Sequence, residues 1–354
     1  MTPSSDHRPP MVYMLHSGNL FGTERMALET LTGFPDYQPV IMAPPGPLME
    51  EIRRRGIFHY PITSKADLIK ALVELLRKHK HLVFMTTALL DVLCLSALNF
   101  VFRRKLSHLH LVHGGASDHL SYGRKKWMNH MKLTQVAVSD YVRQRLLMYG
   151  VKPEKIQVVG NFLSAETLAN ISRRAAFQTG APLKGVIVSR VIPAKRVHLL
   201  FEAMERHSDL KMFSFDVMGV GGQVEILRAR AQAGGLPIEL KGFVDDVHQR
   251  LAGYDFLLHL NCEEPFGMVI LEAIAAGIPV LVPDSGGTAT IITNQSNGLS
   301  FKADDPDDLA RALRDLHKKN AHQLNQLVAA ADQLLANTYH IDTQVAAYRA
   351  LLSP

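Results

Sequence analysis

The sequence predicts an α/β protein made of two doubly wound domains, each with a parallel sheet covered on both faces. The chain has 354 residues, which is enough for two domains of about 150 residues. Hydrophobic residues make up 47% and charged residues 20%, so each half can bury a core and disorder is excluded as the main state. Short apolar runs alternate with helix-period segments along the whole length, as is typical of parallel sheets.

Twelve apolar runs are the expected strands, six in each half. Those of the front half are 12–15, 40–43, 82–86, 109–112, 136–138 and 156–159. Those of the back half are 185–189, 215–218, 238–240, 256–260, 279–282 and 299–301. Amphipathic segments such as 65–79 and 307–318 lie between them and predict the covering helices, and Ser139 is placed to cap one of these helices.

The domain boundary is expected where a polar, basic stretch meets the breakers Gly180, Pro182 and Gly185. We expect a first domain over 1–165, a linker over 166–183, a second domain over 184–336, and a C-terminal helix over 337–354 that packs back toward the first domain. In doubly wound folds ligands bind beyond the carboxyl ends of the strands. Two such domains facing each other predict a ligand in the cleft between them.

Cysteine usage and the termini bear on the compartment. Cys94 and Cys262 are far apart and give neither a disulfide framework nor paired metal-ligand spacing, which favours a reducing compartment. No signal-peptide apolar region follows the polar N-terminus, and the apolar stretch 89–102 is short of the ~20 residues that a membrane span needs. We therefore expect a cytoplasmic protein, free or held peripherally at the inner face of the plasma membrane.

The most informative stretch is 261–284, "NCEEPFGMVILEAIAAGIPVLVPD". It follows an apolar strand, so it lies at a carboxyl edge. Gly267 allows a turn in which backbone approaches a ligand closely, and a helix is expected from Met268 to Gly277. Glu272 comes eight residues after Glu264, and helical geometry over that interval would bring both carboxylates to one face, about 12 Å apart.

This stretch resembles the signature of the retaining glycosyltransferases of family 4, which have the two-domain GT-B fold. The resemblance implies that Glu264 contacts the donor sugar and Glu272 the ribose of the nucleotide. The backbone around Phe266, Gly267, Met268 and Val269 would meet the sugar and phosphates at a helix start, where N–H groups favour anions.

Other segments match the family in the required order. "VIVSRVIPAKRVHLLFEAM" resembles the donor-phosphate segment and implies that Arg190 and Lys195 neutralise the diphosphate. "VMGVGGQVEIL" resembles the glycine turn beside the nucleotide, with Gly219, and "LKGFVDD" the backbone that receives the base at Phe243 and Val244.

The front half matches in two places. "HSGNLFGTERMALETL" resembles the family's glycine loop: Gly22 matches one glycine, and Phe21 stands where the other is expected. "HLHLVHGGASDH" places His113 where the family has a histidine that contacts the donor sugar. A second departure is Thr290, where glutamate is frequent, and we expect it to affect local packing or loop charge more than turnover.

The resemblance implies transfer of a sugar from a nucleotide-diphosphate sugar, with UDP favoured, to an acceptor hydroxyl with retention of configuration. It names His113, Glu264, Arg190 and Lys195 as catalytic. It names as donor-binding Gly22, Arg190, Lys195, Gly219, Phe243, Val244, Glu264, Phe266, Gly267, Met268, Val269 and Glu272. We expect no metal and no cofactor besides the nucleotide sugar. The adjacent pairs Asp245–Asp246 and Asp304–Asp305 are interpreted as solvated caps.

The charge distribution bears on the acceptor. Residues 1–180 carry 23 Lys and Arg against 13 Asp and Glu, whereas 181–354 carry 16 against 20. Basic and large apolar residues are interleaved around 53–58, 100–105 and 122–127, which suits an anionic membrane or a lipid-linked glycan, and equally well basic helix ends over a core.

These observations favour an enzyme of polysaccharide, lipopolysaccharide or other glycoconjugate biosynthesis. The alternative acceptors are a small molecule or a sugar phosphate. Two non-enzyme alternatives are a basic module that binds nucleic acid or membrane, and an inactive partner subunit. No nucleic-acid-binding signature accompanies the basic segments, so nucleic acid is not expected as a partner.

Overall fold

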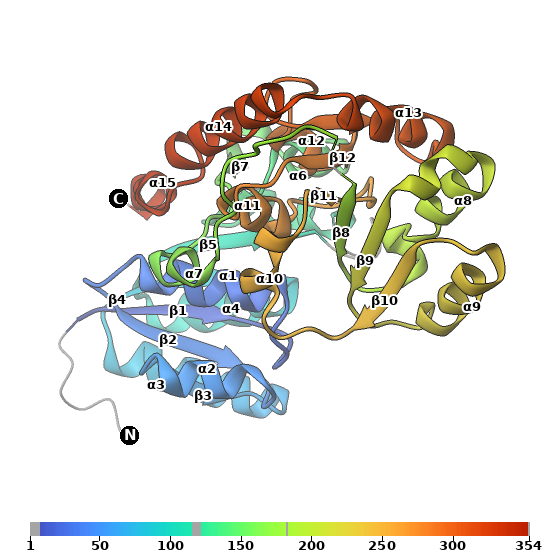
Figure 1. The fold of residues 1–354 in the computed structure, drawn as a ribbon. Coiled ribbons are helices and arrows are strands. Elements are labelled where there is room, and N and C mark those ends of the chain that lie inside the picture. Colours follow the sequence, from blue (N-terminus) through green and yellow to red (C-terminus); the bar gives the residue numbers. More distant parts are fainter. Residues whose placement is uncertain (1–7, 115–121, 182, 353–354) are drawn as a thin grey trace. The chain divides into compact units, whose positions relative to one another are not determined.

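The computed structural model describes residues 8–114, 122–181 and 183–352. The chain separates into two compact units, Met1–Ser164 with Ile341–Pro354, and Ala165–His340. Each unit is built on one parallel sheet, with seven strands in the first and six in the second (Figure 1). The prediction of an α/β fold with two parallel sheets is therefore confirmed.

The first sheet has the strand order β3-β2-β1-β4-β5-β6-β7. Its strands are β1 Pro10–Met14, β2 Gln38–Ala43, β3 Phe58–Pro61, β4 His81–Thr86, β5 Lys105–Val112, β6 Thr134–Ala137 and β7 Ile156–Val158. The helical segments of this unit are α1 Gly22–Thr32, α2 Leu48–Arg54, α3 Lys65–Lys78, α4 Leu89–Phe102, η1 Gly123–His130, α6 Asp140–Met148, η2 Pro153–Lys155 and α15 Ile341–Leu352.

One face of the first sheet is covered by α3 and α4. Leu72 and Leu75 of α3 and Leu95 of α4 are buried in one cluster with Val12 of β1 and Phe84 of β4. Because side chains alternate along a strand, Tyr13 belongs to the opposite face, and its phenol lies close enough to Tyr348 of α15 to be affected electrostatically. The C-terminal helix thus forms part of this unit.

Strand β3 was not predicted from the sequence. It pairs only with β2 and lies at the edge of the sheet. Its side chains are half-buried or exposed, and it follows three consecutive arginines and ends in Pro61. An edge strand needs no continuous apolar run and tolerates proline, so the signal that revealed the inner strands is absent.

The second sheet has the strand order β10-β9-β8-β11-β12-β13. Its strands are β8 Lys184–Val188, β9 Ser214–Met218, β10 Ile238–Gly242, β11 Phe256–Leu258, β12 Val280–Pro283 and β13 Leu299–Phe301. The helical segments are α7 Ala165–Asn170, η3 Pro193–Lys195, α8 His198–Arg206, η4 Ser208–Met212, α9 Val224–Gly234, α10 Val247–Arg250, η5 Leu251–Gly253, α11 Met268–Ala275, α12 Thr288–Ile291, α13 Pro306–His317 and α14 Ala321–Asn337.

The core of the second unit contains a group of packed phenylalanines. Phe213, Phe215 and Phe256 are fully buried and lie against one another, with ring centroids 5.7 to 6.4 Å apart. A Cβ on Gly185 would lie 2.4 Å from the ring of Phe215. Gly185, which the sequence offered as a breaker, is therefore inside β8 because only glycine leaves room for that ring.

The predicted helix cap at Ser139 is confirmed. Its hydroxyl accepts a hydrogen bond of 3.2 Å from the Val142 amide at the start of α6. Across the described ranges, every helix is too short or too polar to cross a bilayer.

Candidate functional site

The predicted donor residues of the second unit gather at one edge of its sheet. Arg190 and Lys195 follow β8, Gly219 follows β9, Phe243 and Val244 follow β10, and Glu264 follows β11. All these strands are parallel, so their carboxyl ends share one edge, which is where doubly wound folds bind ligands.

Glu264 is the centre of a polar cluster at this edge. Its Oε2 atom lies 2.5 Å from Lys195 Nζ, accepts a hydrogen bond of 2.8 Å from Asn261 Nδ2, and lies 3.8 Å from His259 Nε2. The family resemblance had paired Lys195 with phosphate and Glu264 with sugar, and the structure brings the two side chains together.

Burial and charge oppose each other at Glu264. Burial alone would raise the pKa of its carboxyl, but the Lys195 ammonium and the hydrogen bond from the Asn261 amide outweigh that effect, and the pKa lies below its ordinary value of 4.5. Burial lowers the pKa of His259 to about 4, so this imidazole is neutral at physiological pH. The site therefore presents an ionised carboxylate and one ammonium, both largely shielded from water.

The turn that carries Glu264 is held by two glycines, Gly286 and Gly287, that follow β12. The Gly287 amide donates a hydrogen bond of 2.6 Å to the Glu264 carbonyl. A Cβ on Gly287 would lie 2.0 Å from the Pro265 carbonyl oxygen, and one on Gly286, where φ is +79°, would lie 2.9 Å from the Cys262 carbonyl oxygen. The two loops pack backbone on backbone, which only glycine permits.

The predicted helical relation between Glu264 and Glu272 is wrong. Helix α11 starts at Met268, and Gly267 before it has φ +93°, so Glu264 belongs to the preceding turn. Glu272 is inside the helix, with Oε1 3.3 Å from His248 Nε2 of α10. His248 was not predicted from the sequence, because nothing in its local pattern distinguishes it from a solvated histidine.

The residues at the start of α11 divide into backbone and side-chain roles. The Phe266 side chain is buried, and its ring packs edge-on against Tyr339 with centroids 5.5 Å apart. It therefore cannot shape a sugar pocket, and only its backbone remains available to a ligand. Met268 and Val269 are half-buried at the first turn of the helix.

Gly219 is required by a close contact between the loops after β8 and β9. Its φ is +151°, and a Cβ there would lie 1.8 Å from the Ser189 carbonyl oxygen. The Val191 amide donates a hydrogen bond of 2.9 Å to the Val220 carbonyl. These contacts hold the backbone of exposed Arg190 between the ends of β8 and β9.

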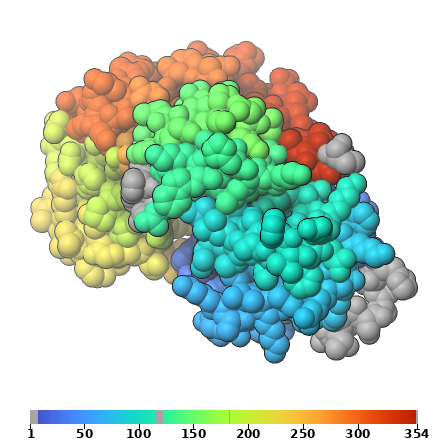
Figure 2. Space-filling view, turned by 180° about the vertical axis from the view of Figure 1, so that it is seen from behind, coloured from blue at the N-terminus to red at the C-terminus, as the bar shows by residue number. Residues whose placement is uncertain are grey.

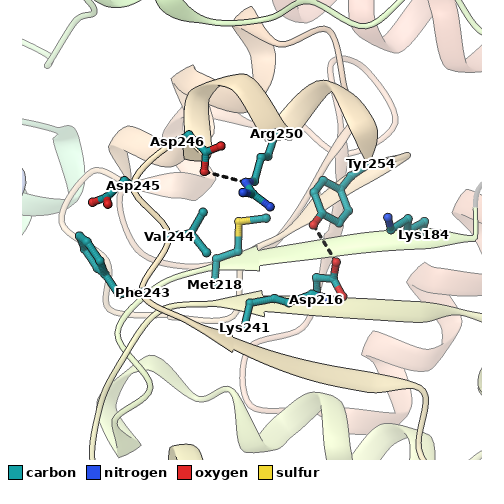
Figure 3. Close-up of a pocket in the computed structure, with 10 residues that line it drawn as sticks. All are labelled: Lys184, Asp216, Met218, Lys241, Phe243, Val244, Asp245, Asp246, Arg250 and Tyr254. Atoms are coloured by element: carbon teal, nitrogen blue, oxygen red, sulfur yellow. Dashed lines mark hydrogen bonds and ion pairs between the residues drawn. The ribbon is translucent and has the colours of Figure 1, made fainter.

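A pocket of about 720 Å³ opens beside this edge (Figure 3). It is lined by Lys184, Asp216, Met218, Lys241, Phe243, Val244, Asp245, Asp246, Arg250 and Tyr254. Figure 3 shows the Tyr254 hydroxyl directed at Asp216, a hydrogen bond of 2.7 Å, and Asp246 paired with Arg250 at 2.6 Å. The pocket includes the predicted base-binding residues Phe243 and Val244, but not Lys195 or Glu264.

One of the predicted solvated pairs has a different role. Asp305 does cap α13, accepting hydrogen bonds from the amides of Asp307 and Asp308. Asp304 instead forms an ion pair of 2.5 Å with Arg196, which lies next to Lys195 and has a left-handed φ of +54°. Asp304 therefore helps to fix the segment that presents Lys195.

Thr290 is the position at which the family often has glutamate. Its hydroxyl donates a hydrogen bond of 2.6 Å to the Gly287 carbonyl. The side chain thus supports the same glycine loop that holds the turn of Glu264.

In the first unit, Gly22 opens α1, and a side chain there would meet nothing within 4 Å. Phe21 precedes it with its side chain exposed, and its amide donates a 3.2 Å hydrogen bond to Glu24. The close backbone approach in this loop lies at Gly18 instead, whose Cβ would be 2.5 Å from the Pro44 carbonyl oxygen. Gly18 was not predicted from the sequence, because its partner loop is 26 residues away along the chain.

His113 follows β5 and is held by β1. Its Nε2 atom lies 2.9 Å from the Tyr13 hydroxyl. Burial, with a smaller contribution from the positive charge of Lys125, lowers the pKa of His113 to about 4. The imidazole is neutral at physiological pH and can take part in a hydrogen bond to a sugar hydroxyl but not in an ion pair. The residues 115–121, soon after it, lie outside the described ranges.

Residues 173–333 match the model of the glycosyl transferases group 1 family. The lipopolysaccharide core biosynthesis glycosyltransferase LpsE of Rhizobium meliloti is 27% identical over 215 residues, 60% of this chain and 62% of that protein. The D-inositol 3-phosphate glycosyltransferase of Geodermatophilus obscurus is 30% identical over 234 residues, 60% of this chain and 51% of that protein. The match thus covers less than two thirds of either relative.

Solved structures match over almost the whole chain. HepE of Anabaena, crystallised with UDP and glucose, has a TM-score of 0.80 at 16% identity, covering 98% of this chain and 99% of its own. A glycosyltransferase of Rickettsia africae has a TM-score of 0.81 at 19% identity, covering 98% of both chains. At such identities these likenesses bear on the fold alone.

The two sheets and the match to solved structures define the class of protein, an α/β protein with two parallel sheets and the GT-B fold. Residues 173–333 belong to the family of glycosyl transferases group 1, glycosyltransferase family 4. The family resemblance inferred from "EPFGMVILEAIAAGIPV" is thereby confirmed.

Proposed function

We propose that this chain is a retaining, metal-independent glycosyltransferase. It transfers a sugar from a nucleotide-diphosphate sugar to a hydroxyl acceptor in glycoconjugate biosynthesis. The observation that carries the proposal is the Lys195–Glu264–Asn261 cluster at the carboxyl edge of the second sheet, beside the N-terminus of α11. An ionised carboxylate accepts hydrogen bonds from sugar hydroxyls, while an ammonium and a helix N-terminus favour phosphate.

Each residue has a part in the proposed reaction. Arg190 and Lys195 neutralise the departing diphosphate, since Arg supplies a fork of donors and Lys a point charge. Glu264 holds the donor sugar, Glu272 the ribose, and the backbone of Phe243 and Val244 the base. The bond from the anomeric carbon to the phosphate oxygen breaks as the bond to the acceptor oxygen forms on the same face. The leaving phosphate oxygen takes the acceptor proton.

In the first unit, neutral His113 contacts the donor sugar through hydrogen bonding. The two units correspond, in this proposal, to the donor domain (165–340) and the acceptor-side domain (1–164 with 341–354). We place the protein in the cytoplasm, where nucleotide sugars are used.

The donor we favour is a UDP-sugar, and the acceptor a growing glycan. Support for the donor comes from HepE, whose structures contain UDP and UDP-glucose. Support for the acceptor comes from LpsE, named for lipopolysaccharide core biosynthesis. The inositol phosphate glycosyltransferase among the relatives favours a second candidate, a sugar-phosphate-like acceptor.

A thermal-shift panel of UDP-glucose, UDP-N-acetylglucosamine, GDP-mannose, UDP and GDP tests the donor site. A ligand at 100 times its Kd adds about 2.7 kcal/mol to the free energy of unfolding. We expect a rise in melting temperature with UDP compounds, and a smaller rise in Lys195→Ala. The proposal fails if no nucleotide or nucleotide sugar shifts the melting temperature.

A further inference from the structure

Helix α4 of the first unit has an apolar stripe that no described residue covers. Fourteen residues form the helix, and only Asp91, Ser96 and Asn99 are polar. Leu95 is buried against the sheet, and Val92 is buried in a separate small cluster. The exposed residues recur at helical spacing along the other side: Leu90, Leu93, Ala97, Phe100 and Val101. Phe100 is 82% exposed and Val101 73%, and large apolar side chains gathered in this way mark an interaction surface.

Segment η1 extends the stripe. Met128 of η1 packs with Val92 of α4 in one small buried cluster, so the two segments adjoin. Trp127, beside Met128, is 59% exposed. Trp127 is also the single tryptophan of the chain. An exposed tryptophan next to an apolar stripe is typical of proteins that dock at a lipid–water interface.

Unpaired cations surround this stripe. The chain turns at Arg103, where φ is +51°, so the basic run 103–105 directly follows Phe102, and the Lys105 amide bonds to the Lys80 carbonyl at 3.1 Å. Six cations in this region are exposed, and none of them has a carboxylate partner among the described residues: Lys80, Arg103, Lys105, Arg124, Lys126 and Lys132. Residues 76–114 and 122–139 contain ten Lys and Arg but a single carboxylate, the buried Asp91.

The second unit shows that this lack of partners is not general. Its surface arginines are paired with carboxylates, as in Arg173–Asp332, Arg230–Glu205 and Arg314–Asp209. The excess positive charge around α4 therefore has no counterpart within the described protein. It matches a surface that supplies many negative charges at once.

The structure excludes residues 53–58, the third basic and apolar segment of the sequence, as a docking surface. Around 53–58, Ile57 is buried and Phe58 packs against the core of the first unit. Arg55 is paired with Glu29 and Glu51. The sequence grouped this basic and apolar segment with 100–105 and 122–127. In the structure its apolar side chains belong to the core, and Arg55 is held in salt bridges within the unit.

We call the remaining surface the α4 face. It consists of the stripe Leu90, Leu93, Ala97, Phe100 and Val101, with Trp127 and the six unpaired cations. Figure 2 shows this part of the first unit in cyan to turquoise.

We propose that the α4 face docks on a bilayer containing anionic lipids. Phe100, Val101 and Trp127 enter the boundary between headgroups and acyl chains, and Arg103, Lys105 and Lys126 lie among the lipid phosphates. Aliphatic residues at helical spacing suit acyl chains rather than the stacked bases of a nucleic acid. The inference does not rest on the proposed transferase activity.

The test uses the full-length protein and two vesicle types, pure phosphatidylcholine and equal parts of phosphatidylcholine and phosphatidylglycerol. We expect the mixed vesicles to bind the protein at low salt, with a blue shift of Trp127 emission, and binding to fall steeply as salt rises. The double variants Phe100→Ser/Val101→Ser and Arg103→Gln/Lys105→Gln should each bind at least about tenfold more weakly.

Matched variants control for loss of any exposed apolar or basic residue. Met148→Ser removes a side chain that is as exposed as Val101, 73%, but lies on α6. Arg25→Gln/Arg53→Gln removes two cations from α1 and α2. Both should bind vesicles within about twofold of wild type, and all variants should keep the thermal shift by nucleotides and their far-UV circular dichroism.

Several outcomes would overturn the proposal. It fails if wild type does not bind the mixed vesicles at low salt, or if the Phe100→Ser/Val101→Ser variant binds them as wild type does. It also fails if a labelled single-stranded oligonucleotide binds more tightly than the vesicles, or if the variant abolishes self-association instead of vesicle binding. A lost nucleotide shift with intact vesicle binding would instead contradict the donor site alone.

Discussion

At the scale of single residues, the site depends on an ion pair between two residues that the sequence assigned to different parts of the donor, Lys195 to the diphosphate and Glu264 to the sugar. Lys195 and Glu264 are 69 positions apart, yet their charged atoms lie 2.5 Å from each other. Because Lys195 already neutralises Glu264, an incoming diphosphate shares the ammonium with that carboxylate. When the diphosphate of the donor contacts Lys195, the sugar hydroxyls must therefore donate hydrogen bonds to Glu264 to replace the contact that it loses.

Removing the Glu264 charge tests this arrangement. Glu264→Gln keeps the size of the side chain and one hydrogen-bond acceptor but removes the charge that fixes Lys195. We expect a turnover loss of about 100-fold or more, the magnitude typical of a lost electrostatic contact, with weaker donor binding by calorimetry. Glu263→Gln is the control, because that carboxylate is largely exposed and 3.6 Å from Arg196. Equal donor affinity and turnover in Glu264→Gln and wild type would disprove the assignment.

Asp91 is a buried carboxyl whose charge affects stability. Burial raises its pKa from the ordinary 3.8 to about 6, although the nearby His16, 3.6 Å away, acts in the opposite direction. The folded protein therefore prefers the protonated acid, and ionising it costs stability as pH rises from about 4 to 6. Above pH 6 that cost is about 3 kcal/mol and constant.

Asn cannot ionise, so Asp91→Asn should be more stable than wild type at pH 7.5 by up to about 3 kcal/mol. The advantage should shrink toward zero near pH 4. Urea unfolding at four pH values measures it, with exposed Asp140→Asn as the control. If the difference between Asp91→Asn and wild type does not change with pH, ionisation of a buried carboxyl is not its cause.

At the scale of elements, loops after strands decide the geometry of the site, and glycines decide how closely those loops pack. Gly287 sits against the turn of Glu264, and Gly219 against the end of β8. In each case a Cβ would lie no more than 2.0 Å from a carbonyl oxygen of another loop. The loops are thus held by backbone contact rather than by side chains.

Gly287→Ala tests this at one position. Its Cβ would push Pro265 and with it Glu264, so we expect a loss of about 1–3 kcal/mol in the free energy of unfolding together with weaker donor binding. Gly253→Ala in η5 is the matched control, since a Cβ there would meet nothing within 4 Å and the residue lies outside the loops assigned to the donor. Chemical denaturation and calorimetry measure the two effects. If both variants behave alike, close packing of the loops is not what positions Glu264.

At the scale of the whole molecule, charge and chemistry are divided between the units. The first unit carries 22 Lys and Arg against 13 Asp and Glu, and the second 17 against 20. The proposed diphosphate-binding residues nevertheless belong to the acidic unit, because two cations at one sheet edge act locally and net charge does not. The excess of the first unit is concentrated at the α4 face.

Hydrogen exchange of the whole chain should map the donor onto the second unit. With saturating UDP-sugar we expect slower exchange in the loops 189–196, 218–222, 242–246 and 261–272. Peptides covering β13 and α13 should be unchanged, since they lie outside the clustered edge residues, and serve as the internal control. Protection confined to β13 and α13 would place the nucleotide elsewhere and contradict the donor site.

The sequence by itself determined the fold class, the family resemblance and, among the residues that the structure describes, every strand except β3. Each follows from local signals, namely strand-length apolar runs, breakers and the string from Glu264 to Val280. Edge strand β3 was not predicted because its side chains are at most half-buried, so it carries no continuous apolar run.

Tertiary structure alone decided which side chains meet. It joined Lys195 to Glu264, placed Glu264 before α11 rather than on it, buried Phe266, and paired Arg196 with Asp304. It also separated the three basic, apolar segments into one that is core and two that form the α4 face. Contacts between distant positions depend on how loops pack at a sheet edge, and no period or spacing along the chain records that packing.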